Sequence, residues 1–207
     1  AETVGYPKCD ILVTETTFGH PRYRFPERSN VEDALCQFCQ SALDEGFHPV
    51  IFAYTLGKAQ EAKKVLSREG FKLCVHGSIL HLSEVYENNG INFGDVIRFN
   101  AKADLNDRVL VMPPNARTGR PILRLKKKRT AFLSGWGLDP SSKYRFGVDE
   151  VIPLSDHADF DGLLDFIKRV EPKKIYTTHG PHQYELYLRD LGYDAEPLVP
   201  KKQKELL

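Results

Sequence analysis

Residues 151–180 read VIPLSDHADFDGLLDFIKRVEPKKIYTTHG, which is the pattern of a strand, a helix and a second strand. The apolar run at 151–154 predicts the first strand. Apolar residues then recur at helical spacing over 160–170, and Pro172 predicts the end of that helix. The β-rich run at 174–178 predicts the second strand, so the segment has the form of a parallel strand–helix–strand unit.

Ionisable side chains follow the predicted strands. His157 and His179 come after the two strands above, and Glu15 comes after another apolar run at 9–14. Ligands of α/β proteins bind at the carboxyl ends of parallel strands. The 22 positions that separate residue 157 from residue 179 are about one crossover between neighbouring strands. We therefore expect a site for metal binding, proton transfer or both, in which a carboxylate orients an imidazole.

Simpler interpretations of these side chains remain open at this point. A single histidine at a strand end is more often an ordinary hydrogen-bonded residue than a ligand. Asp156 and Asp159 could cap the helix that follows them. His182 follows Pro181 in a loop and is expected to be exposed.

Strand and helix patterns alternate along the rest of the chain. Strands are predicted at 9–14, 48–54, 71–76, 108–112 and 131–134, and helices at 31–43, 58–69, 79–88 and 183–191. This alternation with short links predicts an α/β fold with a mostly parallel sheet flanked by helices. The irregular segment 141–147 is the expected crossing between two domains.

Composition narrows the class of protein. The chain has 207 residues, 41% hydrophobic and 28% charged, with a formal net charge of +1, which is typical of a soluble globular protein. The near-zero net charge gives no global electrostatic case for nucleic-acid binding. No apolar run reaches the length of a membrane span, and no basic-then-apolar leader is present, so we expect no membrane contact.

The four cysteines are expected to be free thiols. Cys36 and Cys39 form a C-x-x-C pair, but the pair lies inside the helix predicted at 31–43 and has no further zinc ligands at similar spacing. Free thiols fit a reducing setting best, so a cytoplasmic location is expected.

Three weaker features could contact a ligand. Lys58 follows Gly57 between a predicted strand and helix, where backbone amides and the ammonium could meet a phosphate. Ser134 and Gly135 precede Trp136 in a turn that permits close approach of a ligand to the backbone. The basic run 120–129 could follow a phosphate backbone. Ordinary turns and a solvated charged loop are the competing interpretations.

At Glu15, His157 and His179 the chain resembles the β-CASP branch of metallo-β-lactamase-fold nucleases. DILVTETTFG from Asp10 is similar to that family's motif A, SDHAD from Ser155 to motif B, and THG from Thr178 to motif C. Further segments are most similar to the ligase-associated DNA exonuclease group: TTFGHPRYR from 16, FAYTLGKAQ from 52, VHG from 75, MPP from 112 and SGW from 134.

The resemblance implies an activity and a role for each residue. Glu15 would hydrogen-bond His157, and His157 would contact the scissile phosphate and protonate the leaving oxygen. His179 would bind one of two zinc ions that activate the attacking water. Residues 18–146 would be the β-CASP domain, and residues 1–17 with 147–207 would be the C-terminal part of a metallo-β-lactamase αββα domain. DNA is the favoured substrate and RNA the alternative, with a DNA ligase system as a possible associate.

The chain departs from the family in its zinc ligands. The family carries an H-x-H-x-D-H signature, and none of the seven histidines here forms an H-x-H pair. Zinc needs three or four protein ligands, and His179 alone cannot hold it. We therefore expect the C-terminal portion of a nuclease that by itself is inactive, holds no zinc tightly and self-associates through exposed apolar faces.

Two other functions stay open from the sequence. The chain could be a non-catalytic β-CASP module that binds nucleic acid or a protein partner, with Glu15, His157 and His179 as remnants. A weaker possibility is a small-molecule-binding α/β domain that uses the turn at Gly57.

Overall fold

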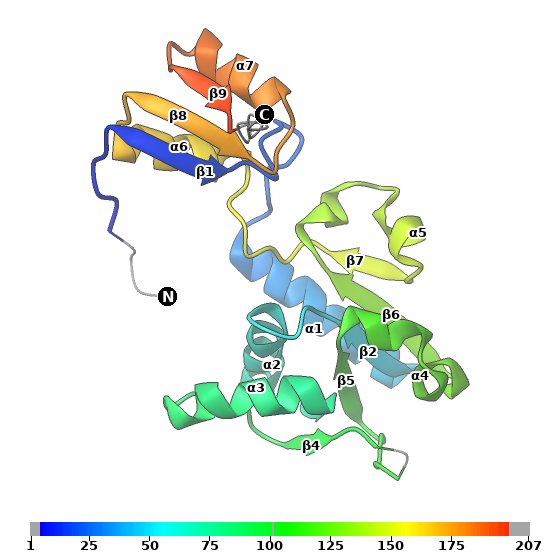
Figure 1. Ribbon diagram of the computed structural model, residues 1–207. Coiled ribbons are helices and arrows are strands. Elements are labelled where there is room, and N and C mark those ends of the chain that lie inside the picture. Colours follow the sequence, from blue (N-terminus) through cyan, green and yellow to red (C-terminus); the bar gives the residue numbers. More distant parts are fainter. Residues whose placement is uncertain (1–4, 101, 199–207) are drawn as a thin grey trace, which may run out of the picture. The chain divides into compact units, whose positions relative to one another are not determined.

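The computed structural model describes residues 5–100 and 102–198, and these residues form two compact units (Figure 1). The smaller unit joins the chain up to Arg24 with the chain from His157 onward, and the larger unit is Phe25–Asp156. The larger unit is thus inserted into the smaller one. Each unit has its own sheet and its own core.

The larger unit is built on a six-stranded sheet in which every strand pairing is parallel. The order of the strands is β4-β3-β5-β2-β6-β7. The strands are β2 (His48–Phe52), β3 (Lys72–Val75), β4 (Val96–Arg98), β5 (Arg108–Met112), β6 (Lys128–Leu133) and β7 (Glu150–Ile152). The central strands are buried on both faces, as near-continuous apolar runs in a parallel sheet require.

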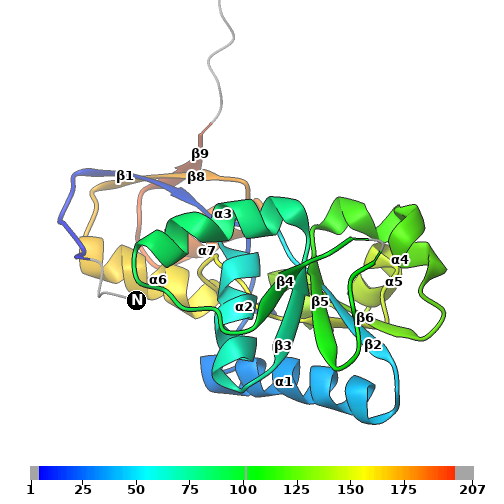
Figure 2. The same ribbon diagram turned by 90° about the horizontal axis from the view of Figure 1, so that it is seen from below.

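Helices cover both faces of this sheet. One core layer lies between the sheet and the long helices α1 (Arg28–Asp44), α2 (Lys58–Arg68) and α3 (Gly77–Asn88). The opposite layer lies beneath α4 (Arg120–Arg124) and partly buried residues of α5 (Ser142–Phe146). Helix α1 runs alongside the strands in Figure 2. The short 3₁₀ helices η1 (Pro114–Thr118) and η2 (Gly135–Leu138) follow β5 and β6.

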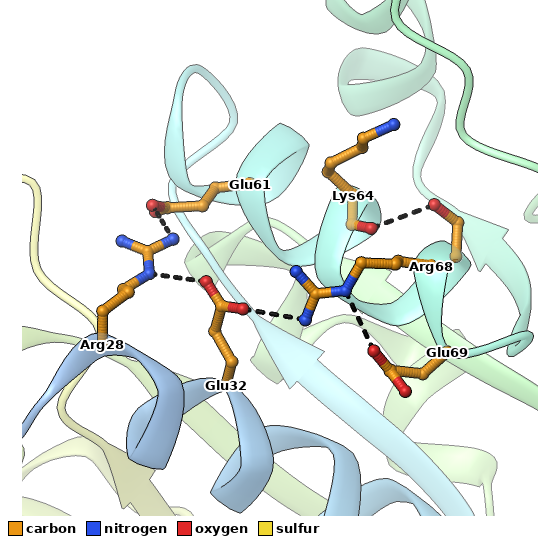
Figure 3. Close-up of polar contacts among 7 residues, drawn as sticks. Arg28, Glu32, Glu61, Lys64, Arg68 and Glu69 are labelled. Carbon is orange, nitrogen blue, oxygen red and sulfur yellow. Dashed lines mark hydrogen bonds and ion pairs between the residues drawn. The ribbon is translucent and has the colours of Figure 1, made fainter. Parts of the chain in front are cut away.

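Charged residues join α1 to α2 on the outside of the larger unit (Figure 3). Glu32 accepts from Arg28 at 2.8 Å and from Arg68 at 2.9 Å. Arg28 also pairs with Glu61, and Arg68 pairs with Glu69 at 2.9 Å. A shared carboxylate between two arginines makes this a network, which stabilises more than isolated surface pairs do.

The smaller unit has a three-stranded parallel sheet in the order β1-β8-β9. Its strands are β1 (Ile11–Glu15), β8 (Lys174–Thr178) and β9 (Ala195–Pro197). Helices α6 (Phe160–Val170) and α7 (Gln183–Asp190) pack against one face, around Leu12 and Ile175. On the edge strand β1, Ile11 and Val13 are 62% and 55% exposed.

The helix α6 forms where its sequence predicts. Asp159 is its N-cap, with the carboxylate accepting from the Gly162 N–H at 2.8 Å. Its apolar residues Phe160, Leu163, Ile167 and Val170 are buried on one face. Glu171 adopts a left-handed conformation at φ 53° after the last turn, and Pro172 prevents the helix from continuing.

The predicted fold class is confirmed, but one sequence interpretation is wrong. Strand β7 pairs with β6 in the larger sheet, whereas β8 pairs with β1 and β9 in the smaller one. The segment 151–180 is therefore not a unit of two neighbouring strands, and helix α6 does not connect strands of one sheet. The local pattern of a strand–helix–strand is present, but the partner of each strand is set by distant residues.

The units divide the chain at other places than the sequence predicts. The expected boundaries lie after residues 17 and 146, and the units divide after Arg24 and Asp156. Phe18 packs edge-on against Tyr23 at 5.2 Å, and the Phe160 N–H donates to the Tyr23 carbonyl at 2.9 Å. These contacts hold residues 18–24 in the smaller unit. The assignment of 1–17, 18–146 and 147–207 to named domains stays a prediction, and residues 1–4 and 199–207 lie outside the described residues.

The segment expected to cross between domains, 141–147, instead contains helix α5. Phe146 stacks on Phe132 of β6 with ring centroids 4.5 Å apart, which places this segment in the larger unit. All four cysteines are free, as expected, and Cys39 and Cys74 are buried. Burial raises the pKa of both thiols, that of Cys74 to about 11. Within the described ranges, no helix has the length and apolarity of a membrane span.

Candidate active site

Strands β1 and β8 bring two of the expected site residues to one edge of the small sheet. The two strands run parallel (Figure 1). Glu15 is in register with Thr178, so His179 directly follows the residue opposite Glu15. The carboxylate of Glu15 and the imidazole of His179 therefore lie at the carboxyl ends of two neighbouring strands. The catalytic role of Glu15 and the metal-binding role of His179 stay predictions.

The turns after β1 and β8 are packed directly on each other. The Thr16 N–H and hydroxyl both donate to the Thr178 carbonyl, at 2.9 and 3.2 Å. A Cβ on Gly180 would overlap the hydroxyl and carbonyl of Thr16, and a Cβ on Gly19 would lie 2.7 Å from the Tyr184 ring. Only glycine fits these two positions, which fixes the geometry of both turns.

Glu15 and His157 form the ion pair at the centre of the site. Nδ1 of His157 lies 3.1 Å from Oε1 of Glu15. The other carboxylate oxygen, Oε2, accepts from the Thr17 backbone N–H at 2.9 Å. Partial burial would raise the pKa of Glu15, but the hydrogen bonds from Thr17 and His157 outweigh burial and lower it. The carboxylate is thus ionised at neutral pH and fixed in orientation.

The fixed carboxylate of Glu15 determines which ring nitrogen of His157 can transfer a proton. Glu15 holds the Nδ1 proton, so Nε2 is the nitrogen that can exchange a proton with a substrate. The ring of Phe18 contacts the imidazole edge-on, with centroids 5.8 Å apart. The imidazole is half exposed, so solvent and a substrate can reach it. This arrangement is suited to general acid–base catalysis.

His179 has an unusual backbone. It is one of three non-glycine residues with positive φ in the described chain, at 55°. Its Nδ1 lies 3.1 Å from the Thr178 hydroxyl. A left-handed conformation costs a residue with a Cβ about 1–2 kcal/mol, and such positions cluster at functional sites. The strain is consistent with a side chain held in place for binding.

The described residues do not by themselves make a zinc site. No group of three histidine, cysteine, aspartate or glutamate side chains converges anywhere in residues 5–100 and 102–198. His179 is an exposed imidazole that could give one ligand, and zinc needs three or four from protein. The residues present therefore do not fit a complete metal centre.

The other candidate residues lie in the larger unit. Lys58 is buried, and its ammonium is 3.5 Å from the carboxylate of Asp156. Ser134 is buried, and its hydroxyl accepts from the Trp136 N–H at 3.3 Å at the start of η2; Gly135 is buried beside it. Contact of Lys58, Ser134 and Gly135 with a substrate stays a prediction.

The simpler interpretations of Asp159 and His182 are confirmed. Asp159 caps helix α6, as above. His182 lies 3.0 Å from Glu185 at the start of α7 with a largely exposed side chain, as expected. The role of Thr17 was not anticipated: its backbone N–H orients Glu15. The sequence carries no clear signal for this contact, because turns in which a side chain accepts from the N–H two residues later are typical of Asp and Asn and not of Glu.

Comparison with known proteins places this geometry in a family. Residues 145–199 match the Zn-dependent metallo-hydrolase RNA specificity domain. This part of the chain is therefore similar to that domain. The match covers motif B and motif C, with His157 and His179. The expected resemblance to β-CASP proteins of the metallo-β-lactamase fold is confirmed by this RNA specificity domain and by the relatives below.

The relatives are longer proteins. The chain is 35% identical over 207 residues to a protein of Opitutus terrae named probable DNA ligase, covering all of this chain and 20% of that protein. It is 23% identical over 220 residues to an RNase J-like protein of Methanocaldococcus jannaschii, covering 84% of this chain and 52% of that one. The chain thus spans about half or less of the length of these relatives, with the RNA specificity domain at its end.

A solved structure shows the same fold. A protein of unknown function from Enterococcus faecalis V583 superposes with a TM-score of 0.61 at 14% sequence identity. The match covers 96% of this chain and 52% of that chain. At this identity the likeness concerns the fold alone.

Proposed function

We propose that this chain is part of a zinc-dependent nuclease that hydrolyses phosphodiester bonds in nucleic acid. The observation that supports the proposal most is the Glu15–His157 pair at 3.1 Å, at the edge of the sheet where His179 also lies. The RNA specificity domain, which contains both histidines, belongs to a family described as Zn-dependent metallo-hydrolases.

In this proposal His157 is the general acid. Hydrolysis adds a water oxygen to phosphorus and breaks the bond from phosphorus to the leaving oxygen, which needs a proton as it departs. Nε2 of His157 supplies that proton, and Glu15 stabilises the imidazolium before transfer through Nδ1. The ring regains its proton from solvent, to which it is half exposed.

In the parent nuclease, His179 would give one ligand to zinc, which would supply an activated water. The remaining ligands are supplied from outside this chain, which alone is inactive and holds no zinc tightly. Zinc analysis of the purified 207-residue chain tests this part. A content near two tightly held ions per molecule would contradict it.

DNA is the proposed substrate and exonuclease action the proposed mode. The similarity of the whole of this chain to 20% of a protein named probable DNA ligase supports DNA and an association with ligation. The RNase J-like relative and the name of the RNA specificity domain support RNA as the alternative. The protein is proposed to act in the cytoplasm. Parallel assays of the whole protein on end-labelled single-stranded DNA and RNA distinguish the two substrates.

The first prediction concerns the acid–base pair in the whole protein. His157→Ala is expected to lower kcat about 100-fold or more, since a general acid contributes roughly that much. Glu15→Gln, which keeps the size of the side chain, is expected to lower kcat less and to change the pH–rate profile on its alkaline side. Initial rates from pH 5 to 9 provide the measurement.

The matched control is His182→Ala, because His182 is also exposed beside a glutamate but lies outside the strand ends. It should retain nearly full activity. If His157→Ala cleaves as fast as the unchanged protein, His157 is not the acid. If all forms bind nucleic acid and none cleaves, the chain belongs to a binding module instead.

A further inference from the structure

A hollow of about 500 Å³ lies at the carboxyl ends of β3, β4 and β5 in the larger unit. Its residues come from separate connections of the sheet: His76–Ser78 after β3, Arg98–Asn100 at the end of β4, and Met112 at the end of β5. Pro121 and Ile122 of α4 complete it. None of the acid–base residues of the small sheet takes part.

The topology of the sheet singles out this place. Strands β3 and β5 are neighbours, but the chain leaves them in opposite directions. From β3 it continues through α3 to β4 on one side, and from β5 through η1 and α4 to β6 on the other. Where two connections diverge in this way, the loops leave a crevice, and ligands of open α/β sheets bind there. The hollow lies at this switch point.

Arg98 gives the hollow an uncompensated positive charge. Its side chain is exposed, and no hydrogen bond or ion pair to another described residue engages its guanidinium. The guanidinium lies against Gly77, where a Cβ would come within 3.1 Å of both Nε and Nη2. Glycine at this position therefore lets the arginine rest over the first turn of α3.

His76 adds a hydrogen-bond donor. Its Nδ1 accepts from the Ser78 N–H at 3.2 Å, which leaves the proton of the neutral ring on Nε2. The polar residues Ser78 and Asn100 also line the hollow, and most of the remaining lining is an apolar wall that includes Phe99, Met112 and Ile122. A charged donor beside an apolar wall suits a ligand that carries a phosphate on one side and a flat ring on the other.

A second hollow, of about 280 Å³, continues the first. The two share Phe99, Asn100 and Pro121, and the second adds Arg120 and Arg124 from the basic run of the sequence. Both arginines are exposed, and no described carboxylate pairs with either. The described lining of the two hollows contains three arginines and no aspartate or glutamate. The groove is thus complementary to more than one negative charge.

We propose that this switch-point groove is a nucleotide-binding site, in which Arg98 and His76 hold a nucleotide phosphate and the apolar wall contacts the base. Arg120 and Arg124 hold a further phosphate when the nucleotide belongs to a strand. The ligand is either a free mononucleotide or a nucleotide of single-stranded nucleic acid. The site goes beyond the proposed hydrolysis, because it needs neither His157 nor zinc.

Calorimetric titration of the full 207-residue chain tests this site, with adenosine 5′-monophosphate and an unmodified single-stranded decanucleotide as probes. Arg98→Gln is expected to weaken the binding of both probes about tenfold, which is the loss of affinity expected from removing one charge-assisted hydrogen bond. Gly77→Ala should weaken them severalfold at unchanged thermal stability, because only the mobile end of Arg98 must move. Lys72→Gln removes the same charge at the amino end of β3 and should change affinity less than twofold.

The two probes identify the source of the ligand. A decanucleotide that binds far more tightly than the mononucleotide, and is weakened further by Arg124→Gln, indicates a strand; equal affinities indicate a free nucleotide. The proposal is overturned if neither probe binds, or if Arg98→Gln leaves both affinities unchanged. His157→Ala must retain the affinity, so a failure of this site and a failure of the proposed hydrolysis give different results.

Discussion

Lys63 is a buried ammonium without a hydrogen-bond partner among the described residues. Its side chain is fully buried in α2, and Nζ lies 3.9 Å from the centre of the Phe93 ring. Burial lowers the pKa of Lys63 from its ordinary 10.5 to about 8. The protonated form is therefore less favourable in the folded chain than in the unfolded one, and the contact with Phe93 offsets only part of that cost.

Lys63→Met is expected to raise the free energy of unfolding at pH 7 by roughly 2 kcal/mol, because it removes the desolvated charge and keeps the volume. The cost of the lysine is fully present below pH 8 and is relieved as pH rises from about 8 to 10.5, since the folded chain loses the proton first. The gain in the free energy of unfolding should therefore be smaller at pH 10 than at pH 7. Urea unfolding at both pH values measures it.

Lys64→Met is the matched control, because Lys64 is the exposed neighbour on the same helix. Its stability should stay close to that of the unchanged chain. A Lys63→Met chain that is less stable at pH 7 would mean that the ammonium has a favourable partner.

The residues of the active site could be predicted in part from the sequence. Glu15, His157 and His179 lie at or after the ends of β1, β7 and β8, as the apolar runs before them indicate, and their catalytic and metal-binding roles stay predictions. The Glu15–His157 contact joins residues far apart in the chain, and no local pattern encodes it. Arg98 was missed because its role depends on a three-residue strand and on the missing side chain of Gly77.

At the scale of elements, the α1–α2 contact depends on Glu32. Burial would raise the pKa of Glu32, but hydrogen bonds from Arg28 and Arg68 outweigh burial and lower it. The stabilisation it gives is therefore present above its ordinary pKa of 4.5 and is lost as pH falls below that value. Two arginines depend on this one carboxylate (Figure 3).

Glu32→Gln is expected to lower the free energy of unfolding by about 1 kcal/mol at low salt, with a smaller loss at high salt. Asp33→Asn removes the same charge from an exposed neighbour in α1 and serves as the reference. Thermal unfolding of both variants at two salt concentrations is the measurement. Equal effects of the two substitutions would show that net charge, and not the network, is responsible.

Long periodic elements could be predicted and most short ones could not; the three-residue strand β7 is an exception because it lies in an apolar run. The helices α1, α2, α3, α6 and α7 lie where apolar spacing predicts them, within a few residues. Strands β4 and β9 have only three residues each, too few to show a period, and both were missed. Helices α4 and α5 have five residues each and lie in segments read as a basic loop and an irregular crossing.

At the scale of the whole molecule, the larger unit contains all that its sheet requires. Both core layers and all six strands lie within Phe25–Asp156. We expect residues 25–156 produced alone to fold cooperatively, because both faces of the sheet stay covered. Circular dichroism and a single sigmoidal urea transition would demonstrate this, and a chain without a cooperative transition would contradict it.

Unit boundaries were the least predictable feature because contacts between distant residues set them. Tyr23 belongs to the smaller unit through the Phe160 N–H, and β7 belongs to the larger unit through β6. Phe160 lies far from Tyr23 in the sequence, whereas β6 is the strand that precedes β7. Composition and family motifs do not show these contacts, so a boundary predicted from them cannot take the contacts into account.

The pairing of β1 with β8 also sets an order of events during synthesis. Ile11 is opposite Lys174, so β1 has no strand partner until about 160 further residues have been made. At roughly 5–20 residues per second, β1 waits on the order of ten to thirty seconds. The inserted unit is complete and can fold during that interval, whereas Leu12, which is 8% exposed in the folded chain, stays open to water and to chaperones. The small sheet is therefore the last part of this chain to form as it leaves the ribosome.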